Sequence, residues 1–221
     1  MRKAPNFDHL AGTYRWMERF TFGPFLSLCR FAFLDELRAS RNALVIGDGD
    51  GRFTARLLKE NPAVLVDALD SSPEMLRALV RSAGIRSSRI RVHLADARLW
   101  DPLVPTLDLI VTHFFLDCLT TKEVASLAKR LRVSARPDTK WVISEFAVPR
   151  GWFGWLVAWP LVTALYIVFW LLTGLSNFRL PNHHKALEQA GFVLSQQRHW
   201  LGGLLVSELW TVRPPAEDRR P

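Results

Sequence analysis

The stretch from Ala43 to Leu76 constrains the fold most, because it combines two apolar runs with a glycine-rich turn between them. The first run, Ala43–Ile46, is short and apolar, as expected of a buried strand. The turn Gly47–Gly51 follows, and after it comes a segment with apolar residues at helical spacing. A second apolar run, Val64–Leu69, leads directly into Asp70. This order of strand, turn, helix, strand and acid predicts a nucleotide-binding βαβ unit.

The parts of this unit have separate physical roles. Glycines allow a tight turn and let backbone N–H groups, with a helix N-terminus behind them, approach a negatively charged group of a ligand. Asp70 follows the turn at roughly the 20-residue offset at which a carboxylate meets a ribose diol. Turn, helix, second strand and acid together indicate a nucleotide more strongly than a glycine-rich loop alone.

The glycine spacing separates two classes of nucleotide. A dinucleotide fingerprint requires Gly-x-Gly-x-x-Gly/Ala, and counted from Gly47 its last position falls on Arg52. The pattern present is Gly47-x-Gly49-x-Gly51, which resembles the first motif of the class I S-adenosylmethionine-dependent methyltransferases. The resemblance runs from about Phe7 to Val212 and is closest to bacterial small-molecule methyltransferases of the quinone-biosynthesis type.

The resemblance implies S-adenosylmethionine as the cofactor, with its methionine end in the glycine-rich loop and its ribose on Asp70. The family often has an acid two residues before the first glycine; Val45 stands there, and we expect Asp48 to take over part of that role. Asp96 would bind the adenine amino group; the alternative is an aspartate that caps its own loop. The residues expected around the cofactor are Tyr14, Gly47, Asp48, Gly49, Gly51, Asp70, Ser71, Met75, Asp96, Ala97, Thr112 and His113.

The rest of the chain favours the same fold class. Further strands are expected at 90–94, 107–111, 141–146, 192–200 and 204–212, with the last two joined as a hairpin by Leu201-Gly202-Gly203. Capping boxes are expected at Ser71-x-x-Glu74 and Thr120-x-x-Glu123. The prediction is a Rossmann-like α/β fold of the class I methyltransferase type. It has a mostly parallel seven-stranded sheet, a C-terminal antiparallel hairpin and helices on both faces.

We expect one domain over residues 1–221. Its expected parts are an N-terminal helical cap at 1–40, a nucleotide-binding core at 41–148, an apolar helical lid at 150–180, a closing helix and hairpin at 181–212, and a flexible tail at 213–221. The opening Phe7-Asp8-x-x-Ala11-x-x-Tyr14 is similar to the start of many small-molecule methyltransferases, where this segment folds over the cofactor. The alternative is a cap that packs on the sheet edge, with a break between two helices at Gly23-Pro24.

The stretch 151–178 carries no charged residue and is long enough for a transmembrane helix. Pro160 interrupts it, however, and it lies between two strands of one sheet, which a membrane span would place on opposite sides of the bilayer. We therefore expect a helical lid whose tryptophans suit contact with a membrane surface. A buried cap helix or a homodimer surface is the alternative.

Composition limits the cellular setting and the partners. The net charge of +8 favours polyanions, either nucleic acid or an anionic membrane, although the arginines are scattered as on a solvated surface. Cys29 and Cys118 have neither metal-ligand nor disulfide spacing, so no metal is expected and a reducing cytoplasm is the default. The N-terminus lacks the apolar core of a secretory signal. We expect a cytoplasmic protein, and the lid favours a peripheral position at the inner membrane face.

Three titratable residues are expected near the reacting methyl group: His113, Asp117 and Glu145. A base is needed only when the acceptor arrives protonated. His113 is the first candidate, since it follows a strand and titrates near neutrality; the alternative is a structural histidine bonded to backbone. Asp117 has the alternative role of capping a turn. His183 and His184 are expected at the start of a helix, exposed or with one of them lining the acceptor pocket.

The sequence therefore predicts an S-adenosylmethionine-dependent methyltransferase with a hydrophobic small-molecule or lipid-like acceptor. A first alternative is a sensor or assembly protein that binds the cofactor without catalysis and forms no acceptor pocket. A second is a nucleic-acid methyltransferase, suggested by charge alone and disfavoured because the Asn/Asp-Pro-Pro-aromatic motif is absent after the fourth strand. It would require basic residues gathered on the face of the site, among them Arg86, Arg89, Arg91 and Arg98.

Overall fold

The computed structural model describes residues 24–102, 106–149, 151, 156, 160, 163 and 180–214. Seven strands form one sheet in the order β3-β2-β1-β4-β5-β7-β6. The strands are β1 Asn42–Ile46, β2 Leu65–Asp70, β3 Ile90–Leu94, β4 Leu107–His113, β5 Ala135–Phe146, β6 Phe192–Trp200 and β7 Leu205–Val212. Strands β1 to β5 are parallel, and β7 pairs antiparallel with both β5 and β6. The predicted sheet and its closing hairpin are confirmed.

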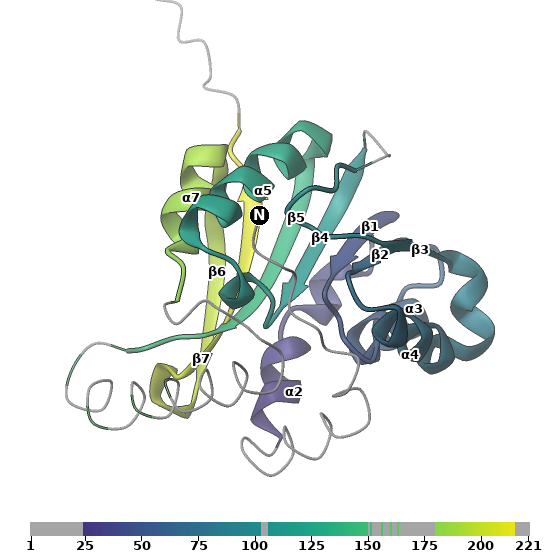
Figure 1. The fold of residues 1–221 in the computed structure, drawn as a ribbon, viewed down its shortest axis with the longest axis horizontal. Coiled ribbons are helices and arrows are strands. Elements are labelled where there is room, and N and C mark those ends of the chain that lie inside the picture. Colours follow the sequence, from purple (N-terminus) through teal and green to yellow (C-terminus); the bar gives the residue numbers. More distant parts are fainter. Residues whose placement is uncertain are drawn as a thin grey trace, which may run out of the picture.

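Helices cover both faces of this sheet (Figure 1). Helices α3 (Arg52–Glu60) and α4 (Pro73–Ala83) pack on one face, and α5 (Thr121–Ser134) and α7 (His183–Ala190) on the other. The short helix α2 (Phe25–Arg30) precedes the sheet. Single 3₁₀ turns are η2 Leu34–Leu37, η3 Gly84–Arg89, η4 Leu116–Cys118 and η6 Leu201–Gly203.

Strand β1 shows how the sequence fills both layers of the core. Side chains alternate between the faces of a strand. Leu44 and Ile46 therefore join the core under α5 and α7, while Ala43 and Val45 join the core under α3 and α4. A parallel strand covered on both faces is apolar where it is buried, which explains why the buried part of β1, Ala43–Ile46, contains no polar residue.

Several expected boundaries differ in the structure. Strand β5 begins at Ala135, before the expected Trp141, and β4 continues through His113. In the described part of the N-terminal cap, the apolar residues divide between α2 and the turn η2. Pro24 is the residue before α2, and the helix expected before the break at Gly23-Pro24 lies outside the described residues.

The two expected capping boxes have different outcomes. The box at Thr120 and Glu123 is confirmed, with both reciprocal hydrogen bonds present. The box at Ser71 and Glu74 is wrong, because the chain enters α4 one residue later. Ser72 is the N-cap, and its hydroxyl accepts the N–H of Met75 at 3.2 Å.

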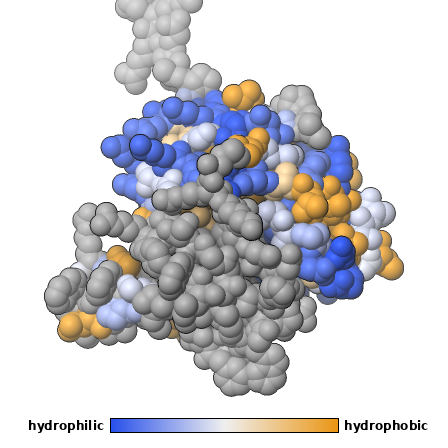
Figure 2. Space-filling view, in the orientation of Figure 1, coloured by the Kyte–Doolittle hydropathy of each residue, from blue (hydrophilic) through white to orange (hydrophobic). Residues whose placement is uncertain are grey.

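The outer faces of α5 and α7 are hydrophilic, whereas apolar residues gather at the side of the molecule where β3 forms the sheet edge (Figure 2). On α5, Val124, Leu127 and Leu131 point inward and are fully buried. On and beside the edge strand, Val92, Leu94 and other apolar side chains are exposed. The helices are therefore amphipathic, as their spacing in the sequence predicts.

Several expectations concern residues outside the described ranges. They include Tyr14, most of the expected lid at 150–180, and the tail beyond residue 214. Within the described part of the chain, no helix has the length and hydropathy needed to cross a membrane.

Candidate functional site

A pocket lies at the carboxyl ends of β1 and β4. These strands are neighbours in the sheet, but β1 leads to α3 on one face and β4 leads to α5 on the other. Such a reversal leaves a crevice that binds ligands in open α/β sheets. Nine of the residues expected around the cofactor line the pocket: Gly47, Asp48, Gly49, Asp70, Ser71, Met75, Asp96, Ala97 and His113.

Two glycines of the turn, Gly49 and Gly51, have different structural roles. Gly49 has φ +60°, and a Cβ built on it would meet no heavy atom within 4 Å, so its backbone faces open space in the pocket. Gly51 has φ +78°, and its Cβ would lie 2.4 Å from the Cα of Leu79. Gly51 is outside the pocket lining, contrary to expectation, because it lets α3 approach the backbone of α4.

Asp48 has a structural role in addition to its place in the pocket lining. Its carboxylate accepts the N–H of Thr54 at 2.8 Å and that of Phe53 at 3.4 Å, so it caps the first turn of α3. Burial raises the pKa of this carboxyl. Asp48 therefore both lines the pocket and holds the first turn of α3.

Asp70 and Asp96 follow neighbouring strands and both line the pocket. One oxygen of Asp70 accepts the N–H of Ser72 at 2.9 Å, which fixes the turn after β2. Asp96 is held by Arg98, whose Nε lies 2.9 Å from both carboxylate oxygens. The hydrogen bonds from Arg98 lower the pKa of Asp96, so this carboxyl is ionised at neutral pH.

Carboxyl groups outnumber guanidinium groups in the pocket. The lining includes Asp48, Asp50, Asp70, Asp96 and Asp117 against Arg30, Arg52 and Arg98. Two of the arginines are paired within the lining: Arg52 Nε lies 2.8 Å from Asp50, and Arg98 is bonded to Asp96. The charge of the lining favours a ligand that carries positive charge.

Arg30 is a pocket residue that the sequence analysis missed. It lies on α2, is only 5% exposed, and places its guanidinium 5.7 Å from the ring centroid of Phe114. The signal in the sequence is an arginine within an otherwise apolar helical pattern, next to Cys29 and three residues before Phe33. A buried cation at that position requires a polar environment, which the pocket supplies.

Thr112 and His113 point to opposite faces of β4, as consecutive strand residues must. Thr112 is fully buried under α5 and α7, where its hydroxyl accepts the indole N–H of Trp141 at 3.0 Å. It therefore does not line the pocket, contrary to expectation. His113 does line it, and its ring meets Phe53 of α3 edge-on, with the centroids 4.5 Å apart.

His113 is bonded to a side chain and not to backbone. Its Nδ1 lies 2.8 Å from Ser144 Oγ, which lies 3.2 Å from the carbonyl oxygen of Cys29 and 3.1 Å from Ser207 Oγ. If Ser144 donates to Cys29, then His113 donates through Nδ1 and carries its lone pair on Nε2. Burial, and then the charge of Arg30, holds the pKa of His113 well below 6.5, so the ring is neutral. Its Nε2 is buried without a hydrogen-bond partner among the described residues.

Glu145 is outside the lining of this pocket and holds the turn that follows β4. One carboxylate oxygen accepts the N–H of Leu116 at 2.8 Å and that of Phe115 at 3.2 Å. Asp117, on the same turn, does line the pocket. Burial, and then the charge of Asp117, raises the pKa of Glu145 well above 4.5. Glu145 is thus a positioning residue for the turn that carries Asp117.

Replacing Glu145 with glutamine is expected to change how stability depends on pH. The folded protein keeps a proton on Glu145 that the unfolded chain releases above about pH 4.5, so this group lowers stability as the pH rises from there toward its folded pKa. The variant lacks that loss, so its stability relative to the wild type should increase as the pH rises above about 5. Urea unfolding at several pH values measures the difference, with Glu74→Gln on the surface of α4 as the control. A difference that does not vary with pH would contradict this account of Glu145.

Of the four arginines expected for a nucleic-acid site, Arg98 lines the pocket, whereas Arg86, Arg89 and Arg91 do not. Arg89 donates to the backbone carbonyls of Leu58, Asn61 and Val64, and Arg91 pairs with Asp67 at 3.0 Å. Arg98 is bonded to Asp96. These side chains hold the fold together and do not form a phosphate-binding surface around the pocket.

His183 and His184 lie in the first turn of α7, as expected. Both contact Glu208, and neither lines the pocket at β1 and β4. They line a second cavity, and among the described residues Phe146 alone lines both this cavity and the first pocket.

Comparison with known proteins agrees with the fold. Residues 43–138 match the family model of a methyltransferase domain. No curated protein matches the sequence.

Three solved structures illustrate the similarity. The mitomycin 7-O-methyltransferase MmcR has a TM-score of 0.65 at 16% identity over 93% of this chain and 59% of its own. The S-adenosylmethionine-dependent methyltransferase SibL has a TM-score of 0.68 at 18% identity over 97% of this chain and 64% of its own.

The N-methyltransferase NodS of Bradyrhizobium japonicum WM9, solved with S-adenosylhomocysteine, has a TM-score of 0.61 at 14% identity over 83% of this chain and 85% of its own. The chain thus spans less than two thirds of the length of MmcR and SibL. At such low identities, similarity to these structures establishes the fold alone. The family model adds a match at the level of sequence, over residues 43–138. Residues 43–138 therefore match the model of a methyltransferase domain, and the chain has the fold that S-adenosylmethionine-dependent methyltransferases share.

Proposed function

We propose that the protein transfers the methyl group of S-adenosylmethionine to a hydrophobic small-molecule or lipid-like acceptor. The observation that carries the proposal is an acid-rich pocket at the reversal point of a methyltransferase fold, with Gly49 and Asp70 in its lining. The cofactor carries a sulfonium, an ammonium and a carboxylate, so its net charge is positive. A dinucleotide carries two phosphates, which the excess of carboxyl groups in the lining would repel.

The pocket residues suggest how the cofactor would lie. Asp70 would accept hydrogen bonds from the ribose hydroxyls, and Asp96 would accept one from the adenine amino group. Arg30 would attract the carboxylate of the methionine end, close to the open backbone of Gly49. These three contacts would place the sulfonium toward the end of β4, where His113 and Asp117 lie.

The reaction is an in-line displacement. A lone pair of the acceptor forms a bond to the methyl carbon while the bond from that carbon to sulfur breaks, and sulfur keeps the electron pair as S-adenosylhomocysteine leaves. The cofactor supplies the reactivity, and the protein contributes orientation and electrostatics. An acceptor that arrives with a proton must lose it, and His113, a neutral imidazole in the pocket lining, would receive or orient that proton through Nε2.

Replacing His113 with alanine is expected to slow methyl transfer about 100-fold or more, while the affinity for S-adenosylmethionine stays nearly unchanged. The measurement is transfer of a labelled methyl group from the cofactor to an organic extract of bacterial lipids, with cofactor affinity measured separately. Ser144→Ala removes the partner of Nδ1 but keeps the imidazole, and should cost less. Turnover at the wild-type rate in His113→Ala would make the histidine structural.

The acceptor class rests on two features of the sequence. The uncharged stretch 151–178 lies where related enzymes build the acceptor pocket, and the net charge of +8 suits an anionic membrane surface. A small-molecule acceptor also agrees with the O- and N-methyltransferases of similar fold. Flotation with liposomes of phosphatidylethanolamine and phosphatidylglycerol tests the membrane part. A protein that stays unbound, with and without the anionic lipid, would remove it.

The pocket between β1 and β4 would hold the cofactor in an enzyme and equally in a sensor that only binds it. In such a sensor the space next to the reactive methyl group would be filled by side chains. The labelled-methyl assay separates these functions, because a sensor would bind the cofactor and transfer nothing.

A further inference from the structure

A second cavity lies beside the cofactor pocket and is lined by histidines that the proposed methyl transfer does not use. His183 and His184 face it from the first turn of α7, His199 from β6 and Glu208 from β7. Phe146, at the end of β5, lines both the cavity and the cofactor pocket. The two spaces are therefore neighbours separated by this side chain.

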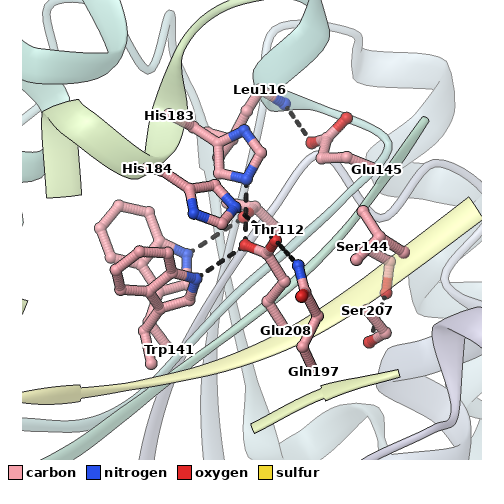
Figure 3. Close-up of polar contacts among 12 residues, drawn as sticks. Thr112, Leu116, Trp141, Ser144, Glu145, His183, His184, Gln197, Ser207 and Glu208 are labelled. Atoms are coloured by element: carbon pink, nitrogen blue, oxygen red, sulfur yellow. Dashed lines mark hydrogen bonds and ion pairs between the residues drawn. The ribbon is translucent and has the colours of Figure 1, made fainter. Parts of the chain in front are cut away.

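Within the cavity, two imidazoles converge on one buried carboxylate (Figure 3). His183 Nε2 lies 3.0 Å from Glu208 Oε2, and His184 Nε2 lies 2.6 Å from Glu208 Oε1. The possible ligand atoms of the three residues all lie within 4.8 Å of one another. Glu208 is 1% exposed, while the side chains of His183 and His184 are 13% and 41% exposed. The group therefore has one buried end and one end open to the cavity.

Two further side chains hold the carboxylate in place. Gln197 Nε2 donates to Glu208 Oε1 at 2.8 Å, and Trp210 Nε1 donates to Oε2 at 2.8 Å. Each oxygen of Glu208 thus receives one hydrogen bond from a fixed neighbour and has its remaining lone-pair direction toward a histidine. In protein metal sites, hydrogen bonds of this kind from neighbouring side chains orient the residues that bind the metal.

We propose that His183, His184 and Glu208 bind a divalent transition-metal ion. The observed nitrogen–oxygen separations of 3.0 and 2.6 Å are hydrogen bonds, which the ion would replace. With metal–ligand bonds of about 2.0–2.2 Å they would give angles of roughly 75–90° at the ion, so a tetrahedral ion would need the imidazoles to move away from Glu208 by a fraction of an ångström. Two imidazoles and one carboxylate then occupy one side of the ion and leave other positions open, an arrangement that suits zinc or iron(II). The open positions would face the cavity and bind an oxygen or nitrogen donor of a molecule there.

The expectation that no metal is bound rests on the spacing of the two cysteines and takes no account of the histidines. The adjacent histidines and their carboxylate are far apart in the chain, and only the pairing of β6 with β7 and the packing of α7 bring them together. The alternative is a hydrogen-bond cluster that fixes α7 against the sheet. The two differ in one measurable property, which is affinity for a metal ion.

The test uses full-length protein without a histidine tag, freed of metal with a chelator. Calorimetric titration with zinc should show one ion per chain, and cobalt(II) should give the visible absorption bands of a site with fewer than six ligands. His183→Gln and His184→Gln should each weaken zinc affinity more than about tenfold. Glutamine keeps an N–H that can donate to Glu208, so these variants should remain folded.

His199→Gln removes a histidine from the same cavity but not from the proposed ligand set, so its affinity should equal that of the wild type. Azide should shift the cobalt(II) spectrum, because an open position lets it bind the ion. Zinc binding that is absent, or that survives both His183→Gln and His184→Gln, would overturn the proposal, as would equal loss in His199→Gln. An unchanged spectrum with azide would overturn the open positions. Because no cofactor is present, failure here is distinct from failure of the proposed methyl transfer.

Discussion

Replacing Asp70 with alanine is expected to weaken the binding of S-adenosylmethionine about 100-fold or more. Hydrogen bonds to a charged group contribute about 1.5–3 kcal/mol each, and the ribose offers two hydroxyls to this carboxylate. A loss of about 3 kcal/mol corresponds to about two orders of magnitude in the dissociation constant. Calorimetric titration of the variant and the wild type measures the difference.

Two further variants separate binding from folding. Asp70 also accepts the N–H of Ser72, so Asp70→Asn keeps an acceptor oxygen for the turn while it removes the charge. It should melt close to the wild type and still bind the cofactor at least about tenfold more weakly. Asp67→Asn changes a carboxylate on the same strand that is bonded to His93 and Arg91 outside the pocket, and should bind normally. Wild-type affinity in both Asp70 variants would mean that the pocket has another ligand.

Replacing Gly51 with alanine is expected to destabilise the fold by about 2–5 kcal/mol. The left-handed backbone at φ +78° accounts for about 1–2 kcal/mol. The added Cβ would also lie 2.4 Å from the Cα of Leu79, and a backbone atom cannot rotate away as a side chain can. Overpacking of this kind costs about 1–3 kcal/mol more. Denaturant unfolding gives the difference in the free energy of unfolding.

The matched control is Gly49→Ala, two residues earlier in the same turn. Gly49 has a similar φ of +60°, but its added Cβ would meet nothing within 4 Å. It should therefore lose only the backbone contribution of about 1–2 kcal/mol. Equal losses at the two positions would show that the approach of Gly51 to Leu79 does not limit stability.

The topology could be predicted because it rests on local patterns. Apolar spacing and glycine-rich turns predict two parts of the sheet. One is the run from β1 through Asp70, and the other is the hairpin of β6 and β7. Together with the resemblance to the class I methyltransferases, they predict a mostly parallel sheet with a closing hairpin, and ligands bind at the carboxyl ends of parallel strands. The expected cofactor residues at the ends of β1, β2 and β3, among them Gly49, Asp70 and Asp96, line the pocket.

The errors at the site have a different origin. Thr112 is expected in the pocket because the predicted strand ends at residue 111. In the structure β4 continues through His113, so Thr112 is a strand residue and points to the face opposite His113. Asp48 and Gly51 satisfy the packing and capping of α3, which a loop motif does not reveal. Arg30 reaches the pocket, and Glu208 reaches the two histidines, through contacts between residues far apart in the sequence. Such contacts become visible only in the folded chain.

The central claim is that the pocket between β1 and β4 binds S-adenosylmethionine. Its most direct test is calorimetric titration of the purified wild-type protein with S-adenosylmethionine, S-adenosylhomocysteine and NAD. The account predicts that the first two bind with dissociation constants on the order of micromolar, about −8 kcal/mol, and that NAD does not bind. Binding of NAD, or of none of the three, would contradict it.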